Sequence, residues 1–212
     1  MKACVVVFGR EPIPGEVKSR LAAGIGANAA AQVYGALLVP PLGVGRGSGA
    51  RVVVSLAELP SGSWSLDQDV VVEVQRGDDL GERMADAFTR RFAEGERRVV
   101  IVGSDCPWLR GTHIAKASAK LGGADVLLGP ATDGGYWLVA QRPPGLAIFS
   151  DIPWSSPETL GDTRKRIRAL GGTWLELEEL VDIDTVDDLE LVLSDPRTPE
   201  TLRLRLLDAL SR

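Results

Sequence analysis

Three aspartates of this sequence stand where carboxylates could hold a metal ion. Asp105 follows the apolar run of residues 99–102 in a turn closed by Pro107, and Asp182 and Asp184 alternate with apolar residues later in the chain. Alternate residues of an extended segment share one face, so the last two carboxylates are expected to point the same way. Hard cations prefer oxygen ligands, and open α/β sheets bind ligands beyond the carboxyl ends of their strands. The three aspartates could therefore complete an Mg²⁺ or Mn²⁺ site with phosphate oxygens, although Asp105 alone could equally cap a helix.

A basic, glycine-containing loop follows the apolar run of residues 3–8. Gly9 and Gly15 would let the backbone approach a ligand closely, and Lys18 with Arg20 brings two cations to the start of a helix. Lysine, arginine and a helix N-terminus together suit the oxygens of a polyphosphate. A solvated basic helix start is the alternative interpretation. The loop lacks the Walker pattern, which disfavours a P-loop ATPase.

A third polar segment, residues 129–137, follows the predicted strand 125–128. Asp133 could bind a metal or a substrate, and Gly134 with Gly135 would leave room for a sugar or a base against the backbone. A hairpin turn of the Asp-Gly type explains the aspartate and the first glycine without any function.

The remaining reactive residue types support no nucleophilic site. His113 is the only histidine and falls in a predicted first helical turn, where a surface or capping role is expected, so nothing favours a Ser-His-Asp or Cys-His arrangement. Cys4 and Cys106 lie in or beside predicted strands and are expected to be buried free thiols. Residues 77–84 are typical of a loop and an acidic helix start, from which Arg83 could contact a substrate.

The elements that must position these residues alternate between strand and helix. Apolar runs rich in β-branched residues predict strands, and helical spacing predicts the segments between them, which is the pattern of βαβ units on a mostly parallel sheet. The expected strands are residues 3–8, 51–56, 70–75, 99–102, 125–128 and 136–140, and the expected helices are residues 27–38, 81–93 and 112–121. The sequence thus predicts an α/β protein whose polar loops follow its strands.

Two segments lie outside that alternation. Residues 40–49 are rich in glycine and proline, which predicts an exposed loop and not the interior of a helix. Residues 199–212 carry leucines among arginines, and this pattern predicts a terminal amphipathic helix that packs on the domain, with a contact in a homodimer as the alternative.

The composition narrows the class of protein. The chain has 212 residues, of which 44% are hydrophobic and 25% charged, and this fits one water-soluble globular domain. Its net charge of -5 argues against a general nucleic-acid binder. No apolar stretch approaches the roughly 20 residues that cross a bilayer, and the first apolar run is too short for the core of a signal peptide. We therefore expect a single domain over residues 1–212, no membrane partner and a cytoplasmic location.

Several motifs, taken in their order along the chain, resemble those of one bacterial family. They are Pro-x-Pro-Gly-x-Val-Lys-Ser-Arg-Leu, Gly-Asp-Asp-Leu-Gly-Glu-Arg-Met, Gly-Ser-Asp-Cys-Pro, Gly-Pro-Ala-x-Asp-Gly-Gly-Tyr, Pro-Trp-Ser-Ser-Pro and Asp-Ile-Asp-Thr. The sequence resembles the DUF2064 family over residues 6–189. That family is grouped with glycosyltransferase-A-like, nucleotide-diphospho-sugar transferase folds and is similar to molybdenum-cofactor and phospholactate guanylyltransferases.

The resemblance implies a three-layer α/β/α sandwich with a mostly parallel, Rossmann-like central sheet. Members of the family usually have a longer helix before the second strand, and residues 43–49 of this sequence depart from that pattern. A divalent metal shared with the phosphates of a nucleotide is implied as well. Carried over by position, the metal ligands are Asp105 and Asp184; the catalytic residues are Lys18, Arg20 and Asp105; the nucleotide-binding residues are Phe8, Gly9, Gly15, Lys18, Arg20 and Ser104; and the substrate-binding residues are Asp79, Arg83, Asp133, Gly134, Gly135, Trp154 and Ser155.

Three functions remain open at this point. The first is glycosyl transfer from a nucleotide-diphospho-sugar to a small acceptor, with Mg²⁺ or Mn²⁺ stabilising the diphosphate. The second is nucleotidyl transfer from a nucleoside triphosphate to a phosphorylated small molecule, in which Lys18 and Arg20 would stabilise the charge on the α-phosphate and the departing pyrophosphate. The third is a non-catalytic protein that binds a nucleotide.

Overall fold

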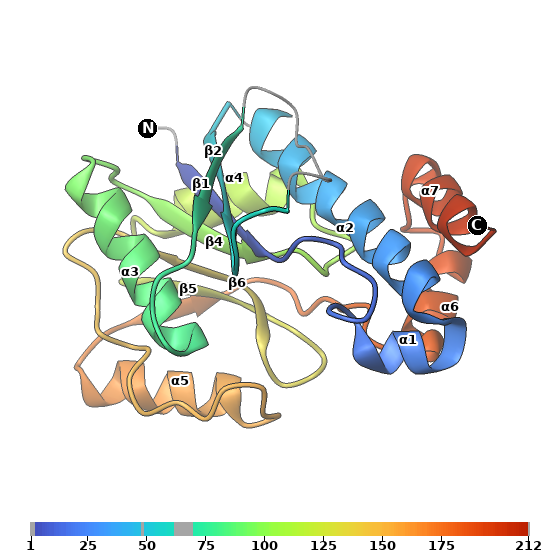
Figure 1. Ribbon diagram of the computed structural model, residues 1–212. Helices are drawn as coiled ribbons and strands as arrows, with labels where there is room; N and C mark the ends of the chain where they lie inside the picture. The colour runs from blue at the N-terminus through green and yellow to red at the C-terminus, as the bar shows by residue number, and fades with distance from the viewer. Residues whose placement is uncertain (1–2, 48, 62–69, 212) are drawn as a thin grey trace.

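Within residues 3–47, 49–61 and 70–211, which the computed structural model describes, seven strands form one sheet (Figure 1). Their order is β3-β2-β1-β4-β6-β5-β7, and β6 runs antiparallel to both of its neighbours while the other pairs are parallel. The strands are Cys4–Gly9 (β1), Arg51–Leu56 (β2), Val71–Val74 (β3), Val99–Gly103 (β4), Val126–Pro130 (β5), Tyr136–Gln141 (β6) and Trp174–Glu176 (β7).

Helices cover both faces of this sheet. Figure 1 shows α3 and α5 on one side, while α1, α2, α6 and α7 gather on the other. The helices are Ser19–Ile25 (α1), Ala27–Gly47 (α2), Leu80–Ala93 (α3), Gly111–Lys120 (α4), Thr159–Ala169 (α5), Val186–Ser194 (α6) and Glu200–Leu210 (α7). The predicted three-layer α/β/α sandwich with a mostly parallel sheet is confirmed.

The alternation of side chains along each strand explains the two cores. In β1, Val5 and Val7 pack with α2 and α4, while Cys4 and Val6 pack with α3 and α5 on the opposite face. Because both faces are covered, the central strands are apolar at nearly every position and carry no polar alternation. This is why short continuous apolar runs were sufficient to locate them.

One prediction from composition is wrong. Residues 40–49 were expected to form an exposed loop, but α2 continues through Pro40 and Pro41 as far as Gly47. Each proline removes one backbone donor from a helix and is disfavoured in its interior. Here the helix is held by packing instead, since Leu37 and Pro41 are buried and Leu42 packs against the larger core. Tertiary burial outweighs the unfavourable local composition. The expected departure of residues 43–49 from the longer helix of the family is also wrong, because α2 extends to Gly47.

Other differences concern small elements and their ends. The helix α5 and the three-residue strand β7 were not predicted, and α1 was foreseen only as a helix start. The C-terminal helix is present as α7, which buries Leu202 and Leu206 against the rest of the protein.

Both cysteines are buried free thiols, as predicted. In the described ranges, none of the helices combines the length and apolarity needed to cross a bilayer.

Leu37→Ala tests the packing of α2 against the sheet. Leu37 is fully buried in the larger core, so removing its isobutyl group should lower the free energy of unfolding by about 2–5 kcal/mol. The control is Leu204→Ala on α7, whose side chain is 57% exposed and should change stability by less than about 0.5 kcal/mol. Urea unfolding measures both, and equal losses in the two variants would contradict the packing described here.

Candidate functional site

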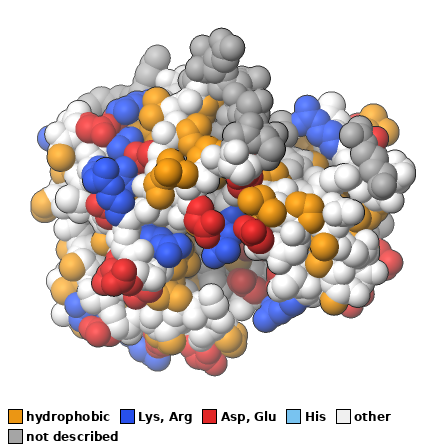
Figure 2. Space-filling model, in the orientation of Figure 1, with side chains coloured by type: hydrophobic (Ala, Val, Ile, Leu, Met, Phe, Trp, Pro, Cys, Tyr) orange, Lys and Arg blue, Asp and Glu red, His pale blue; other side chains and the backbone are white. Residues whose placement is uncertain are grey.

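A cleft of about 540 Å³ opens beyond the carboxyl ends of β1 and β4. The visible face in Figure 2 is hollowed near its centre, where acidic and basic side chains gather side by side. Of the residues predicted for the site, the cleft lining includes Phe8, Gly9, Lys18, Asp79, Arg83, Ser104, Asp105, Trp154, Ser155 and Asp184. These residues come from five separate stretches of the chain, and the fold brings them to one edge of the sheet.

Alternating charges form a chain across the cleft wall. The ammonium Nζ of Lys18 lies 2.7 Å from Oδ2 of Asp105 and 4.0 Å from Oδ1 of Asp184. Arg20 donates to the other oxygen of Asp184 at 2.9 Å. The Lys18 side chain is only 7% exposed, whereas the Asp105 and Asp184 side chains are 35% and 42% exposed. A buried cation thus faces two carboxylates that remain open to the cleft.

The backbone at Lys18 is unusual. Its φ is 52°, in the left-handed region that non-glycine residues seldom adopt, and it precedes the first residue of α1. Such conformations cost free energy and persist only where surrounding contacts determine them. The contact with Asp105 is one such constraint. We read this backbone geometry as the consequence of holding the ammonium inside the cleft wall.

Asp184 is brought to Asp105 by main-chain bonding. The N–H of Ile183 donates to the carbonyl oxygen of Asp105 at 3.2 Å, which joins the segment before α6 to the turn after β4. Thr185 then caps α6, and Asp188 accepts hydrogen bonds from the N–H groups of Asp184 and Thr185 at 3.1 and 2.8 Å. The capped start of α6 therefore fixes the position of Asp184.

Asp182 differs from Asp184 in its environment. Burial, together with the negative charges of Asp105 and Asp133, raises the pKa of Asp182 to about 7. Asp182 is not part of the cleft lining. Among the described residues, no group of three or more carboxylate, histidine or cysteine side chains is arranged to hold a metal ion. The described residues thus bring Asp105 and Asp184 to the cleft as a pair, without the third aspartate that the sequence suggested.

That pair suits a cation that also takes ligands from a substrate. Mg²⁺ is typically held by one or two carboxylates, while waters and substrate phosphates supply the rest of its coordination shell. Asp105 and Asp184 both face the cleft, and no third protein ligand is in place in the described parts of the chain. The donor set fits a divalent ion bound jointly with a polyphosphate.

The opposite wall of the cleft is built by the start of α3. Asp79 caps this helix by accepting a hydrogen bond from the N–H of Glu82 at 2.8 Å, as the acidic helix start predicted. Arg83 donates through Nε to the carbonyl of Gly77 at 3.0 Å. Gly81 leaves the room that Trp154 needs, because a Cβ on Gly81 would lie 2.6 Å from the indole ring. Trp154 therefore lines the cleft while packing on α3.

The Asp133 turn lies outside the cleft lining. It connects the antiparallel strands β5 and β6, and the Asp133 carboxylate accepts the N–H of Gly135 at 2.8 Å. Gly134 has a φ of 89°, and a Cβ there would lie 2.2 Å from the carbonyl oxygen of Pro157. These contacts match the hairpin-turn interpretation. Gly15 and Arg20 also lie outside the lining, although Arg20 is tied to it through Asp184.

Sequence reasoning missed other residues of the cleft wall. Arg10, Tyr34, Gln75 and Asp78 all line it. Their neighbours in sequence were recognised as loop or helix positions, but only the crossing of α2 over the end of β1 places Tyr34 there. His113, by contrast, is a buried capping residue whose Nδ1 accepts the N–H of Arg110 at 3.1 Å, and it has no place in the cleft.

Asp182→Asn tests the desolvated carboxyl in the metal-free protein. With a raised pKa, the folded state holds one proton more than the unfolded state between about pH 4 and pH 7. Stability should therefore fall across this window as pH rises, by an amount on the order of 2–4 kcal/mol. The variant should lose this dependence and be more stable than wild type at pH 8.

Chemical unfolding at pH 4.5, 6 and 8 in the presence of a chelator measures the effect. The matched control is Asp187→Asn, which alters an exposed aspartate in the first turn of α6 and should keep the wild-type pH dependence. A variant at Asp182 with an unchanged pH profile would contradict the raised pKa.

Solved structures share this arrangement of strands and helices. A protein of Desulfovibrio desulfuricans G20, provisionally assigned as a nucleotide-diphospho-sugar transferase, is 31% identical, with 99% of this chain and 97% of that one covered and a TM-score of 0.88. Rv0371c of Mycobacterium tuberculosis H37Rv is 19% identical over 92% of this chain and 99% of its own, with a TM-score of 0.56. The inositol-1-phosphate CTP transferase of T. maritima is 12% identical over 99% and 96%, with a TM-score of 0.54.

The last two similarities establish the fold alone, and it is a fold used by transferases. No curated protein matches the sequence. The family model described as an uncharacterized protein conserved in bacteria, DUF2064, matches residues 44–156, a segment that contains Asp105 but neither Lys18 nor Asp184. The D. desulfuricans protein extends the similarity over the whole cleft. The chain belongs to the DUF2064 family.

Proposed function

We propose that this protein is a metal-dependent transferase that acts on a nucleotide-activated donor. In its most specific form, the proposal is glycosyl transfer from a nucleotide-diphospho-sugar to a small acceptor. The observation that carries it is the buried Lys18 ammonium, which lies 2.7 Å from Asp105 and 4.0 Å from Asp184 in the wall of an open cleft. The name of the D. desulfuricans protein supports the choice of donor.

The two carboxylates are the proposed metal ligands. Bound to Asp105 and Asp184, Mg²⁺ or Mn²⁺ would neutralise charge on the diphosphate of the donor. Both carboxylates are already held in place, Asp184 by the capping of α6 and Asp105 by a hydrogen bond from the Ser104 hydroxyl at 2.8 Å. Rigid ligands of this kind favour one geometry of the bound phosphates.

The two cations are the proposed stabilisers of the leaving group. Lys18 pairs with Asp105, and Arg20 pairs with Asp184. A diphosphate bound to a metal ion at these two carboxylates would therefore lie close to both basic side chains. Fixed positive charge beside a departing diphosphate lowers the barrier to its departure. Arg83 and Trp154, on the opposite wall, are then placed to contact the rest of the donor or the acceptor.

Nucleotidyl transfer is the second candidate, and the same basic pair favours it. Lysine and arginine next to two metal-binding carboxylates could equally stabilise an α-phosphate under attack and the pyrophosphate that leaves. The two reactions differ in their products. A glycosyl transferase releases a nucleoside diphosphate, whereas a nucleotidyl transferase releases pyrophosphate, so analysis of the phosphorus products distinguishes them.

A thermal-shift panel tests the shared core of both candidates. Wild-type protein is melted with nucleoside triphosphates and nucleotide-sugars, each with and without Mg²⁺ or Mn²⁺. We expect a higher melting temperature only where nucleotide and metal are present together, since a ligand that binds the folded state stabilises it. Asp105→Asn should abolish this shift, whereas the matched control Asp187→Asn, which alters an exposed residue, should keep it.

The pattern of shifts also separates the candidates. A metal-dependent shift with a nucleotide-sugar supports glycosyl transfer. A metal-dependent shift with a nucleoside triphosphate, and with none of the nucleotide-sugars, supports nucleotidyl transfer. Nucleotide binding of equal strength with and without a chelator, in wild type and in Asp105→Asn, would refute the metal site. Binding without turnover of any donor would leave the non-catalytic nucleotide-binding protein as the better description.

A further inference from the structure

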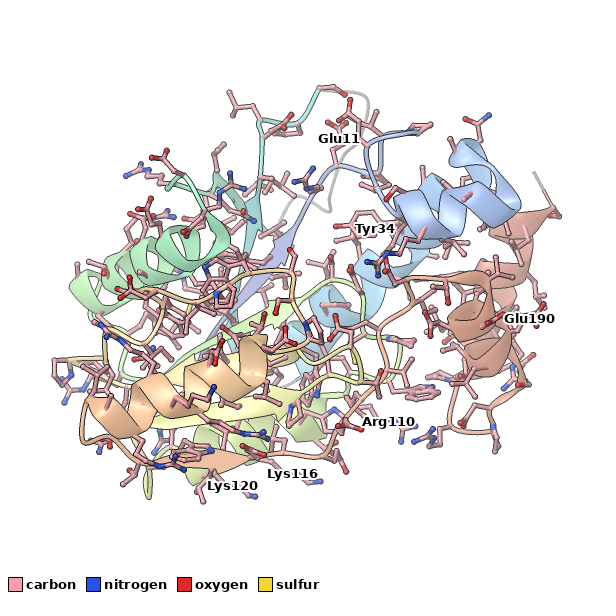
Figure 3. The ribbon with its side chains drawn as sticks, turned by 90° about the horizontal axis from the view of Figure 1, so that it is seen from below. Glu11, Tyr34, Arg110, Lys116, Lys120 and Glu190 are labelled. Carbon is pink, nitrogen blue, oxygen red and sulfur yellow. The ribbon has the colours of Figure 1, made fainter. Side chains whose placement is uncertain are left out.

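The hydroxyl of Tyr34 lies inside the cleft wall and takes part in a continuous series of hydrogen bonds. Tyr34 belongs to α2, is 4% exposed, and packs its ring against Val17, Ala31 and Leu38. Its side chain extends from α2 toward the loop that follows β1 (Figure 3). There its hydroxyl accepts a hydrogen bond from the N–H of Arg10 at 2.9 Å. The same hydroxyl lies 2.9 Å from Oγ of Ser104.

Hydrogen-bond chemistry fixes the direction of this series. Oγ of Ser104 lies 2.8 Å from Oδ1 of Asp105, and an ionised carboxylate can only accept, so the single Ser104 proton points to Asp105. The bond between Tyr34 and Ser104 must then use the Tyr34 proton. A one-way relay results, from the backbone N–H of Arg10 through Tyr34 and Ser104 to the carboxylate.

The two ends of this relay belong to different functional parts of the cleft. Arg10 lies in the loop after β1, the predicted phosphate-binding loop, whereas Asp105 follows β4 and faces Lys18 through its other oxygen at 2.7 Å. Both oxygens of the Asp105 carboxylate are thereby engaged, one by Ser104 and one by Lys18. The rotation of the carboxylate about its own bond is fixed.

Gly9 leaves the space that the relay needs. A Cβ on Gly9 would lie 3.2 Å from the Tyr34 hydroxyl and 3.5 Å from Oγ of Ser104. The contact with Tyr34 is tight, so a side chain there would press on its hydroxyl, while the distance to Ser104 is an ordinary van der Waals contact. Gly9 is therefore explained by the neighbouring Tyr34 hydroxyl as well as by the approach of a ligand.

We propose that Tyr34 is a positioning residue which, through Ser104, holds the Asp105 carboxylate in its metal-binding orientation and couples that orientation to the loop after β1. The metal-binding part of this inference rests on the proposed function. Burial and the nearby charge of Asp105 raise the pKa of Tyr34 to about 12, so the phenol stays protonated and remains a donor throughout the physiological range.

Crystal structures and NMR of variants test the relay independently of function. Tyr34→Phe keeps the ring and removes only the hydroxyl, and Tyr136→Phe, at the only other tyrosine of the sequence, is the matched control. We expect the Asp105 carboxylate to turn from its position in wild type only in Tyr34→Phe. We also expect Ser104→Ala to shift the resonance of the slowly exchanging Tyr34 hydroxyl proton. The relay would be overturned if the Asp105 carboxylate kept its wild-type orientation in Tyr34→Phe. It would also be overturned if Ser104→Ala left the resonance of the Tyr34 hydroxyl proton unchanged.

Mn²⁺ titration tests the functional consequence. With UDP-glucose or CTP as the probe, the Mn²⁺ concentration that gives half of the thermal shift should rise about 10-fold or more in Tyr34→Phe and in Ser104→Ala, as is usual when a partner of a metal ligand is lost. The double variant should be no worse than the more impaired single variant, because both act through Asp105. Tyr136→Phe should change the concentration less than about twofold.

The outcomes separate the relay from the proposed function. An unchanged Mn²⁺ requirement in Tyr34→Phe, despite a displaced carboxylate, would overturn the coupling to metal binding. Absence of any metal-dependent shift in wild type with either probe would count against the proposed function, while the crystal and NMR results would still decide whether Tyr34 positions Asp105.

Discussion

The buried ammonium of Lys18 is the interaction on which the arrangement of the cleft depends. A charge that is 93% removed from solvent would be strongly destabilising without a partner, and Asp105 supplies one at 2.7 Å, with Asp184 nearby at 4.0 Å. Satisfying it requires three loops to meet, one after β1, one after β4 and one before α6. The left-handed backbone at Lys18 is a local cost of that meeting.

The sheet topology makes this convergence possible. The strands β1 and β4 are parallel neighbours, so the loops at their carboxyl ends emerge side by side. The third loop comes from a distant part of the sequence, and a main-chain hydrogen bond between Ile183 and Asp105 joins it to the second. The antiparallel β6 separates β4 from β5 without disturbing this edge. A mostly parallel sheet thus collects charged residues that are more than 160 positions apart, as the pair of Arg20 and Asp184 illustrates.

Much of this could be read from the sequence, because fully buried parallel strands leave continuous apolar runs followed by polar turns. Asp105 and Lys18 were identified for that reason. The extension of α2 through Pro40 and Pro41 could not be read, because it depends on packing that overrides local preference. The place of Tyr34 in the cleft could not be predicted either, because it depends on how α2 crosses the end of β1. Asp182 looked equivalent to Asp184 by spacing, but only Asp184 lines the cleft, whereas desolvation raises the pKa of Asp182.

The central claim is that Asp105 and Asp184 share a divalent ion with the phosphates of a nucleotide. The most direct measurement is the anomalous signal of Mn²⁺ in crystals grown with Mn²⁺ and a non-hydrolysable nucleotide-sugar. The account predicts one peak in contact with both carboxylates and with phosphate oxygens, and a Lys18 ammonium that has exchanged Asp105 for phosphate. A bound nucleotide with the pair of Lys18 and Asp105 intact, and no manganese at either carboxylate, would contradict it.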